Sequence, residues 1–185
     1  MSSALHLTAS LDRCLITGYS LFPTPFKSMS KTTPATLALT KAGIAFETAI
    51  YDYNPDADRV GLQAAEALGV SPSVVLKTLM AEVDGKPVCV VVPSDEEVNM
   101  KKLAAALGGK SAHMMKPADA ERLTGYKVGG ISPFGQKRPV PTAVEEMATL
   151  EEEVFLNGGQ RGLQLRMKPD VLVAALSAKT ADLIR

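Results

Sequence analysis

The sequence has little of the chemistry on which most metal centres and catalytic triads depend. It contains two cysteines, Cys14 and Cys89, and two histidines, His6 and His113. The cysteines lie far apart and in no metal-ligand spacing, and neither histidine has an acidic or cysteine partner at ligand spacing. These absences argue against a zinc site, a serine–histidine triad and a disulfide framework. So few cysteines also suit a reducing compartment, and we expect a cytoplasmic protein.

Long apolar runs and net charge are missing as well. No run of about 18 apolar residues occurs, so we expect no membrane-spanning segment. The 20 basic side chains balance 20 acidic ones, and bulk charge therefore gives no sign of nucleic-acid binding. The charge is uneven along the chain, with 8 Lys or Arg against 2 Asp or Glu over residues 100–138. This distribution permits either a basic face for phosphates or an ordinary solvated surface.

One stretch resembles a phosphate-binding loop without its essential parts. Residues 104–111 read AAALGGKS, with Ala104 where the first glycine is required, and a helix is expected before the motif instead of a strand. The glutamates at 96–97, 145–146 and 151–153 are most simply solvated surface. If the protein is an enzyme, it works without the usual nucleophile and base.

Length and composition predict one domain with a substantial core. The chain has 185 residues and a hydrophobic content of 46%, and the expected domain spans residues 31–185. Residues 1–30 lack periodicity, and their broken apolar patches do not form a secretory signal. Met29 stands just before a helix start. We interpret this N-terminal extension either as a loose or misassigned tail or as a segment that docks on the domain.

Turn and cap signals divide the rest of the chain into interspersed helices and strands. Thr33 before Pro34 is typical of a helix start, and Asp84-Gly85 is typical of a two-residue hairpin. Since at least two hairpins are expected, we predict an α/β (α+β) fold with a mixed, largely antiparallel, curled sheet. The pattern predicts helices at 34–42, 59–68, 99–107, 117–124 and 169–176, and strands at 44–51, 74–83, 86–93, 111–115 and 139–144, with two more within 153–167.

The stretch GYKVGGISPFGQKR, residues 125–138, stands out as a candidate site. Its four glycines allow sharp bends and close approach to a ligand, and Pro133 makes a central strand unfavourable. A loop of this kind can direct successive backbone N–H groups at an anion or a developing oxyanion. The alternative is an ordinary glycine-rich surface turn.

Lys77 is unusual because it lies on an apolar strand face with Val75, Leu79 and Ala81. An ammonium there is costly to desolvate unless an anion or hydrogen-bond acceptors meet it. Lys77 is therefore either a cation directed into a cleft or a strand-edge lysine that reaches water.

Six stretches along the chain, taken in order, form a recognisable series. They are TPA (33–35), FETAIY (46–51), VLKTL (75–79), KKLAAALG (101–108), TGYKVGGISPFGQK (124–137) and GGQRGLQL (158–165). The series resembles the YbaK/EbsC family, single-domain deacylases that act in trans on mischarged Cys-tRNA(Pro) and are related to the editing domain of bacterial prolyl-tRNA synthetases. The resemblance covers about residues 31–182 and implies a mixed sheet curled toward a barrel with surrounding helices.

The resemblance also implies roles for individual residues. Lys77 would contact the 3′-terminal nucleotide of the tRNA, and Thr78 and Tyr51 would line the same pocket. Gly129 would place its backbone N–H near the scissile ester carbonyl, with Gly130 in the same catalytic loop.

Four further positions are implied to bind substrate. Ile131 and Ser132 follow the glycine pair in the motif. Asn157 and Gln164 depart from the best-known family pattern, in which a serine and an aspartate are expected. Both can still hydrogen-bond, but the charge of the carboxylate is lost, and the aminoacyl specificity stays open.

The family is thought to need no side-chain nucleophile, because the cysteinyl thiol of the substrate attacks its own ester and releases a cyclic thiolactone. The resemblance thus implies no cofactor and no metal. It implies the 3′ end of an aminoacyl-tRNA as partner, with prolyl-tRNA synthetase in a ternary complex, and neither DNA nor a membrane. Two alternatives stay open: a deacylase for another small residue such as alanine or proline, and a non-catalytic module that binds aminoacyl-tRNA or a synthetase.

Overall fold

A computed structural model describes residues 31–56 and 59–185. The N-terminal extension, and with it both interpretations of residues 1–30, lies outside the described residues. The helices are α1 (Pro34–Lys41), α2 (Val60–Leu68), α3 (Met100–Ala106), α4 (Pro117–Thr124) and α5 (Pro169–Leu176), with short 3-10 turns at Pro72–Val74 and Glu146–Leu150. The strands are β1 (Glu47–Ile50), β2 (Val75–Val83), β3 (Lys86–Pro93), β4 (Ala112–Met114), β5 (Thr142–Glu145), β6 (Val154–Asn157), β7 (Leu163–Met167) and β8 (Lys179–Ala181).

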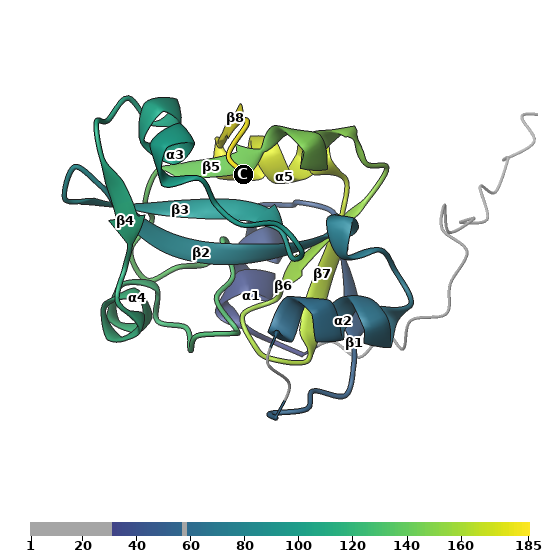
Figure 1. Ribbon diagram of the computed structural model, residues 1–185. Coiled ribbons are helices and arrows are strands. Elements are labelled where there is room, and N and C mark those ends of the chain that lie inside the picture. The colour runs from purple at the N-terminus through teal and green to yellow at the C-terminus, as the bar shows by residue number, and fades with distance from the viewer. Residues whose placement is uncertain (1–30, 57–58) are drawn as a thin grey trace, which may run out of the picture.

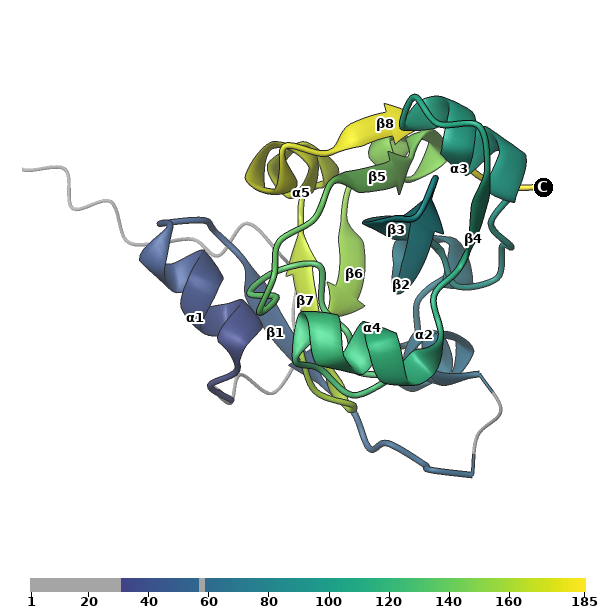
Figure 2. The ribbon, with the colours of Figure 1, turned by 90° about the vertical axis from the view of Figure 1, so that its left-hand side faces the viewer.

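All eight strands belong to one mixed sheet, in the order β1-β7-β6-β2-β3-β5-β8, with β4 pairing separately with β2. The pairs β1–β7, β6–β7, β2–β3 and β2–β4 are antiparallel, whereas β2–β6, β3–β5 and β5–β8 are parallel. The sheet bends from β1 and β7 round to β5 and β8 (Figures 1 and 2). It does not close into a barrel, since no described pairing joins β1 to β8. The expected α/β class with a mixed, curled sheet is confirmed.

The hairpin between β2 and β3 forms as its sequence predicts. Asp84 and Gly85 both adopt the left-handed region, with φ of 48° and 75°. Two such residues give the turn whose twist matches that of antiparallel strands. Val83 and Lys86 are consequently paired across the turn, which sets the register of the whole hairpin.

Helices cover both faces of the sheet. The main core lies on one face, where α1, α4 and α5 pack, and it includes Leu76, Met80, Cys89, Val91 and Leu165. Two smaller clusters lie on the other face, one under α3 around Ala81 and Val90, the other under α2 around Val75 and Phe155. Cys89 is fully buried in the main core, and burial raises the pKa of its thiol to about 12.

The chain after α5 adds one element that the sequence pattern does not predict. Strand β8 is three residues long, two of them are exposed, and among the described strands it pairs only with β5. So short a segment carries no readable alternation. The other difference is that β5 begins at Thr142, after Pro139 and Pro141, because a proline cannot donate to a sheet ladder.

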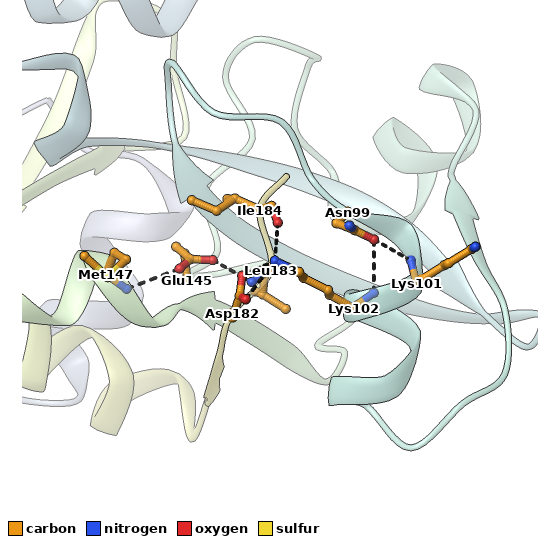
Figure 3. Close-up of polar contacts among 8 residues, drawn as sticks. All are labelled: Asn99, Lys101, Lys102, Glu145, Met147, Asp182, Leu183 and Ile184. Atoms are coloured by element: carbon orange, nitrogen blue, oxygen red, sulfur yellow. Dashed lines mark hydrogen bonds and ion pairs between the residues drawn. The ribbon is translucent and has the colours of Figure 1, made fainter.

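The last residues are anchored by a buried carboxylate. Glu145 is 1% exposed, and its two oxygens accept hydrogen bonds from the backbone N–H groups of Leu183 and Met147, at 2.6 and 3.3 Å. Lys102 adds contacts to the Asp182 carboxylate and the Ile184 carbonyl (Figure 3). The C-terminal segment is thereby fixed against α3 and β5.

Candidate active site

Strand β2 has a break along one of its two edges. Strand β3 occupies one edge over residues 76–83. On the other edge β6 pairs with residues 75–76 and β4 with residues 81–83. Residues 77–80 therefore face no strand of the described chain on this side, which leaves strand-edge groups available to a ligand.

Backbone alternation identifies which peptide groups face this break. The carbonyl of Met80 points toward it and accepts a hydrogen bond from the N–H of Met115 at 3.0 Å. In an antiparallel strand the N–H and C=O of residues two apart point to the same edge. The peptide groups of Thr78 consequently face the break.

A cavity of about 510 Å³ opens at the break, a volume typical of small-ligand sites. Six predicted site residues line it: Lys77, Thr78, Gly129, Ile131, Asn157 and Gln164. The rest of the lining comes from segments 59–61, 94–97 and 114–115, from Pro117 and Ala120 of α4, from the neighbouring residues 75–76 and 79–80 of β2, and from Val128. The cavity thus brings together the lysine of β2 and the glycine-rich loop.

Lys77 lies half-buried between the two smaller core clusters. Its Nζ donates to the carbonyl of Ser94 at 3.3 Å and to the carbonyl of Glu96. Burial lowers the pKa of Lys77, and nearby Arg59 lowers it further, while the carboxylates of segment 95–97 oppose the shift. Because an ammonium has three N–H donors, two carbonyl acceptors leave the third for an anionic group in the cavity.

Gly129 lies at the turn of the glycine-rich loop with φ of +82°, a conformation that favours glycine. Its N–H donates to no acceptor in the described part of the chain. The N–H of Gly130 is already used, since it donates to the carbonyl of Lys127 at 2.8 Å. Gly130 also does not line the cavity. Of the glycine pair, the amide of Gly129 is therefore the one available to a ligand.

Asn157 and Gln164, paired across β6 and β7, form one side of the cavity. The Nδ2 of Asn157 donates to the carbonyl of Gly129 at 3.1 Å. The Oε1 of Gln164 and the Oγ1 of Thr78 are both buried and have no hydrogen-bond partner in the described residues. Buried acceptors without partners are rare, and in a cavity they suit the donors of a ligand.

Tyr51 and Ser132 lie outside the cavity lining. Tyr51 packs in the cluster under α2, and burial raises the pKa of its hydroxyl, while contacts with the backbone of Gly162 and the side chain of Gln164 oppose the shift. Ser132 is fully buried, and its Oγ accepts from the N–H of Phe134 at 3.3 Å while its carbonyl accepts from Gln136. In this structure both residues therefore support the walls of the cavity instead of facing its interior.

Sequence reasoning missed much of the cavity wall. Met114 ends β4 and is 45% exposed, and Met115 follows it in the connection to α4. Their contribution follows from the break in β2, which a sequence pattern does not reveal. Glu96 and Glu97, expected as ordinary surface, line the rim of the cavity, and Glu97 also pairs with Arg185.

Two kinds of feature are absent from residues 31–56 and 59–185. No three His, Cys, Asp or Glu side chains come together as a metal site would require. None of the helices there is long and apolar enough to cross a membrane.

The molecule is similar to known editing proteins. The family model of the aminoacyl-tRNA editing domain matches residues 55–175. EbsC of Enterococcus faecalis, which is named by inference as a Cys-tRNA(Pro)/Cys-tRNA(Cys) deacylase, is 33% identical over 136 residues, covering 72% of this chain and 82% of that protein. A proline–tRNA ligase of Maridesulfovibrio salexigens is 34% identical over 100 residues, which is 54% of this chain and 17% of the ligase.

Solved structures agree with these matches. The crystal structure of a protein described as a candidate trans-editing enzyme for prolyl-tRNA synthetase superposes with a TM-score of 0.74 and 25% identity, covering 84% of this chain and 99% of that one. The hypothetical protein APE2540 superposes with a TM-score of 0.75 and 26% identity. On the extent of these matches, the chain belongs to the aminoacyl-tRNA editing domain family.

Proposed function

We propose that this protein is a trans-editing aminoacyl-tRNA deacylase that removes cysteine from mischarged Cys-tRNA(Pro), and also from Cys-tRNA(Cys). Membership of the editing family and the likeness to EbsC support the reaction class and the substrate. The acylated 3′ end of the tRNA would enter the cavity at the break in β2. Prolyl-tRNA synthetase, to whose editing region the chain is similar, is the proposed partner that supplies tRNA selectivity.

The observation that carries this proposal is the set of polar groups in the cavity. It offers the ammonium of Lys77 and the unused backbone N–H of Gly129, beside the strand-edge groups of Thr78. The hydroxyl of Ser94 donates a hydrogen bond to the carbonyl of Val75. The described lining residues include no histidine or cysteine. Such a cavity can bind and polarise an ester, but none of its carboxylates, at residues 95–97, is hydrogen-bonded to a hydroxyl of the lining that it could activate as a nucleophile.

A substrate that carries its own nucleophile fits this cavity. Lys77 would hold the phosphate of the terminal nucleotide, and the N–H of Gly129 would bind the ester carbonyl oxygen. The cysteinyl sulfur then attacks the ester carbon, forming a C–S bond and breaking the C–O bond to the ribose. The thiol proton ends on the ribose oxygen, so the products are a cyclic thiolactone and a free tRNA end.

Typical free-energy contributions support a mechanism with so few catalytic groups. An aminoacyl ester is already activated, and well-oriented intramolecular attack can supply roughly 7–11 kcal/mol of the barrier. A single oxyanion donor is worth about 3–4 kcal/mol. Rigid positioning and one directed N–H are then sufficient for rapid ester cleavage.

Gln164 favours a second candidate within the same class. Its buried carboxamide is neutral where the family pattern has an aspartate, so the cavity has lost a charge that would recognise an ammonium or a thiol. A deacylase for another small residue, such as alanine or proline, would keep the binding of the tRNA end and change only this contact.

A panel of charged tRNAs tests the proposal. We expect rapid loss of the ester from Cys-tRNA(Pro) and none from the same tRNA carrying serine, because a hydroxyl is a far weaker nucleophile at neutral pH. Cleavage of the alanyl or prolyl ester instead would identify the second candidate. Tight binding without loss of any ester would replace the enzyme with a non-catalytic binding module.

A further inference from the structure

The turn that carries Gly129 is held at nearly every polar main-chain atom. The N–H of Val128 donates to the Oε1 of Glu121 at 3.0 Å. The carbonyl of Gly129 accepts from Asn157, and the N–H of Gly130 donates within the turn. One N–H between Val128 and Gly130 is left over, that of Gly129 itself. A turn fixed in this way presents a single donor in a single direction.

The remaining atom, the carbonyl oxygen of Val128, is held by Arg161. The Nε and Nη2 of Arg161 donate to it at 3.1 and 2.7 Å. This carbonyl and the N–H of Gly129 belong to the same planar peptide group, so fixing one fixes the direction of the other. Hydrogen bonds in series also polarise one another, and a cation on the carbonyl strengthens the N–H as a donor.

Arg161 is itself positioned by two contacts. Its guanidinium lies over the ring of Tyr53, 5.4 Å from the ring centre. A Cβ at Gly129 would come within 3.1 Å of its Nε, so the guanidinium lies directly against the glycine. Stacking on Tyr53 and two hydrogen bonds to one carbonyl together hold this long, exposed side chain in one conformation. A single contact in water would not be enough to do so.

We infer that Arg161 is a positioning residue of the active site, which directs the N–H of Gly129 toward the reacting carbonyl through the peptide group that they share. This inference rests on the proposed function and assigns to Arg161 no contact with the substrate. Lysine is a poor substitute, because an ammonium cannot place two parallel N–H donors on one carbonyl while stacking on Tyr53.

Arg161→Ala and Arg161→Lys test the inference, with Arg122→Ala as the control. Arg122 is an exposed arginine on α4 that pairs with Asp119 and does not line the cavity. We expect the alanine variant to lower kcat roughly 10- to 100-fold, as misplacement of a reacting group does. KM should change less than about threefold, because ground-state binding is kept. The lysine variant should fall between, and the control should match the unchanged protein.

Chemical rescue separates positioning from other roles. Millimolar guanidinium, far below denaturing concentrations, should restore part of the kcat of Arg161→Ala, whereas equal concentrations of potassium or methylammonium should not. If Arg161 instead binds a tRNA phosphate, Arg161→Ala should raise KM and keep kcat. The three cations should then have the same effect on the variant, because each only screens the phosphate charge. That result, or an alanine variant as active as the unchanged protein, would overturn the inference.

A spectroscopic readout keeps the inference testable apart from activity. In the ¹⁵N-labelled protein, Arg161→Ala should shift and broaden the amide signals of Val128, Gly129 and Gly130, and leave α3 and β3 unchanged. Unmoved signals would refute the role of Arg161 in positioning the Gly129 peptide group. If the unchanged protein cleaves no ester while the signals respond, the proposed function fails and this positioning role of Arg161 stands.

Discussion

The cavity has two walls that are stabilised in different ways. The cation wall consists of Lys77 and the segment 94–97, whose carbonyls accept from its ammonium. That segment is fixed from outside the cavity, because the following residues, 98–99, pair with the C-terminal residues 183–184. The amide wall is the turn 127–130, which side chains grip directly.

Because the two walls are supported differently, changes in them should affect different quantities, the folding stability for one and the reaction rate for the other. The cation wall depends on the fold as a whole, through the buried carboxylate that holds the C-terminal segment (Figure 3). Damage to this buried support should loosen the fold and ligand binding together, whereas loss of Lys77 itself should affect the ligand without loosening the fold. The amide wall depends on contacts near the surface of the molecule, so damage there should slow the reaction while the fold persists.

Lys77→Met gives the largest expected effect and tests the cation wall at its functional end. Removing a half-buried cation that meets an anionic group should weaken catalytic efficiency by roughly 2–5 kcal/mol. The free energy of unfolding should stay equal or rise. Burial lowers the pKa of Lys77, so its charge lowers the free energy of unfolding at every pH below that lowered pKa. This cost decreases as pH rises from the lowered pKa to the ordinary value of an unfolded lysine, and above that value it is gone.

Single-turnover cleavage and urea unfolding measure the two quantities. Lys86→Met, at the exposed end of the β2–β3 hairpin, is the matched control. Full cleavage by Lys77→Met would remove the ammonium from the mechanism, and a large loss of stability would show that it holds the fold instead.

Glu145→Ala tests the same wall at its structural end. The N–H groups of the buried Leu183 and of Met147 lose their charged acceptor, at an expected loss of about 2–3 kcal/mol in the free energy of unfolding. Binding of the acylated tRNA end should weaken in parallel, because segment 94–97 loses its support. The exposed neighbour Glu146→Ala should change neither quantity. Lost stability with unchanged binding would uncouple the C-terminal segment from the cavity.

Gly129→Ala sharpens the comparison from the side of the amide wall. Alanine at a positive φ should lower stability by roughly 1 kcal/mol. Gly43→Ala is the matched control, since Gly43 has φ of +67° and open space where the Cβ would lie. Both variants should lose similar stability in urea unfolding, but only Gly129→Ala should lose most of its cleavage rate. Equal rates in the two variants would show that the orientation of the Gly129 amide is irrelevant.

The two walls also show which parts of the site can be predicted from the sequence and which cannot. Lys77 and the glycine pair carry local signals, a cation on an apolar strand and a loop rich in glycine, so both walls were recognisable. The break in β2 depends on where β4 and β6 end, which is a property of pairing between distant segments. The same holds for Arg161, whose role appears only when its loop meets the turn at Gly129. Local chemistry is readable in the sequence, whereas support from distant segments is not.

Arg185→Ala is expected to have the smallest effect, and it marks the limit of the coupling. Arg185 pairs at 2.7 Å with Glu97, the last residue of the segment that holds Lys77, but both side chains are about 70% exposed. An exposed pair of this kind is worth about 0.2–1 kcal/mol and is screened by salt. Stability and cleavage should both change little, and any difference should vanish in high salt. A loss of cleavage that persists in high salt would mean that this surface pair, rather than the buried Glu145, positions the cation wall.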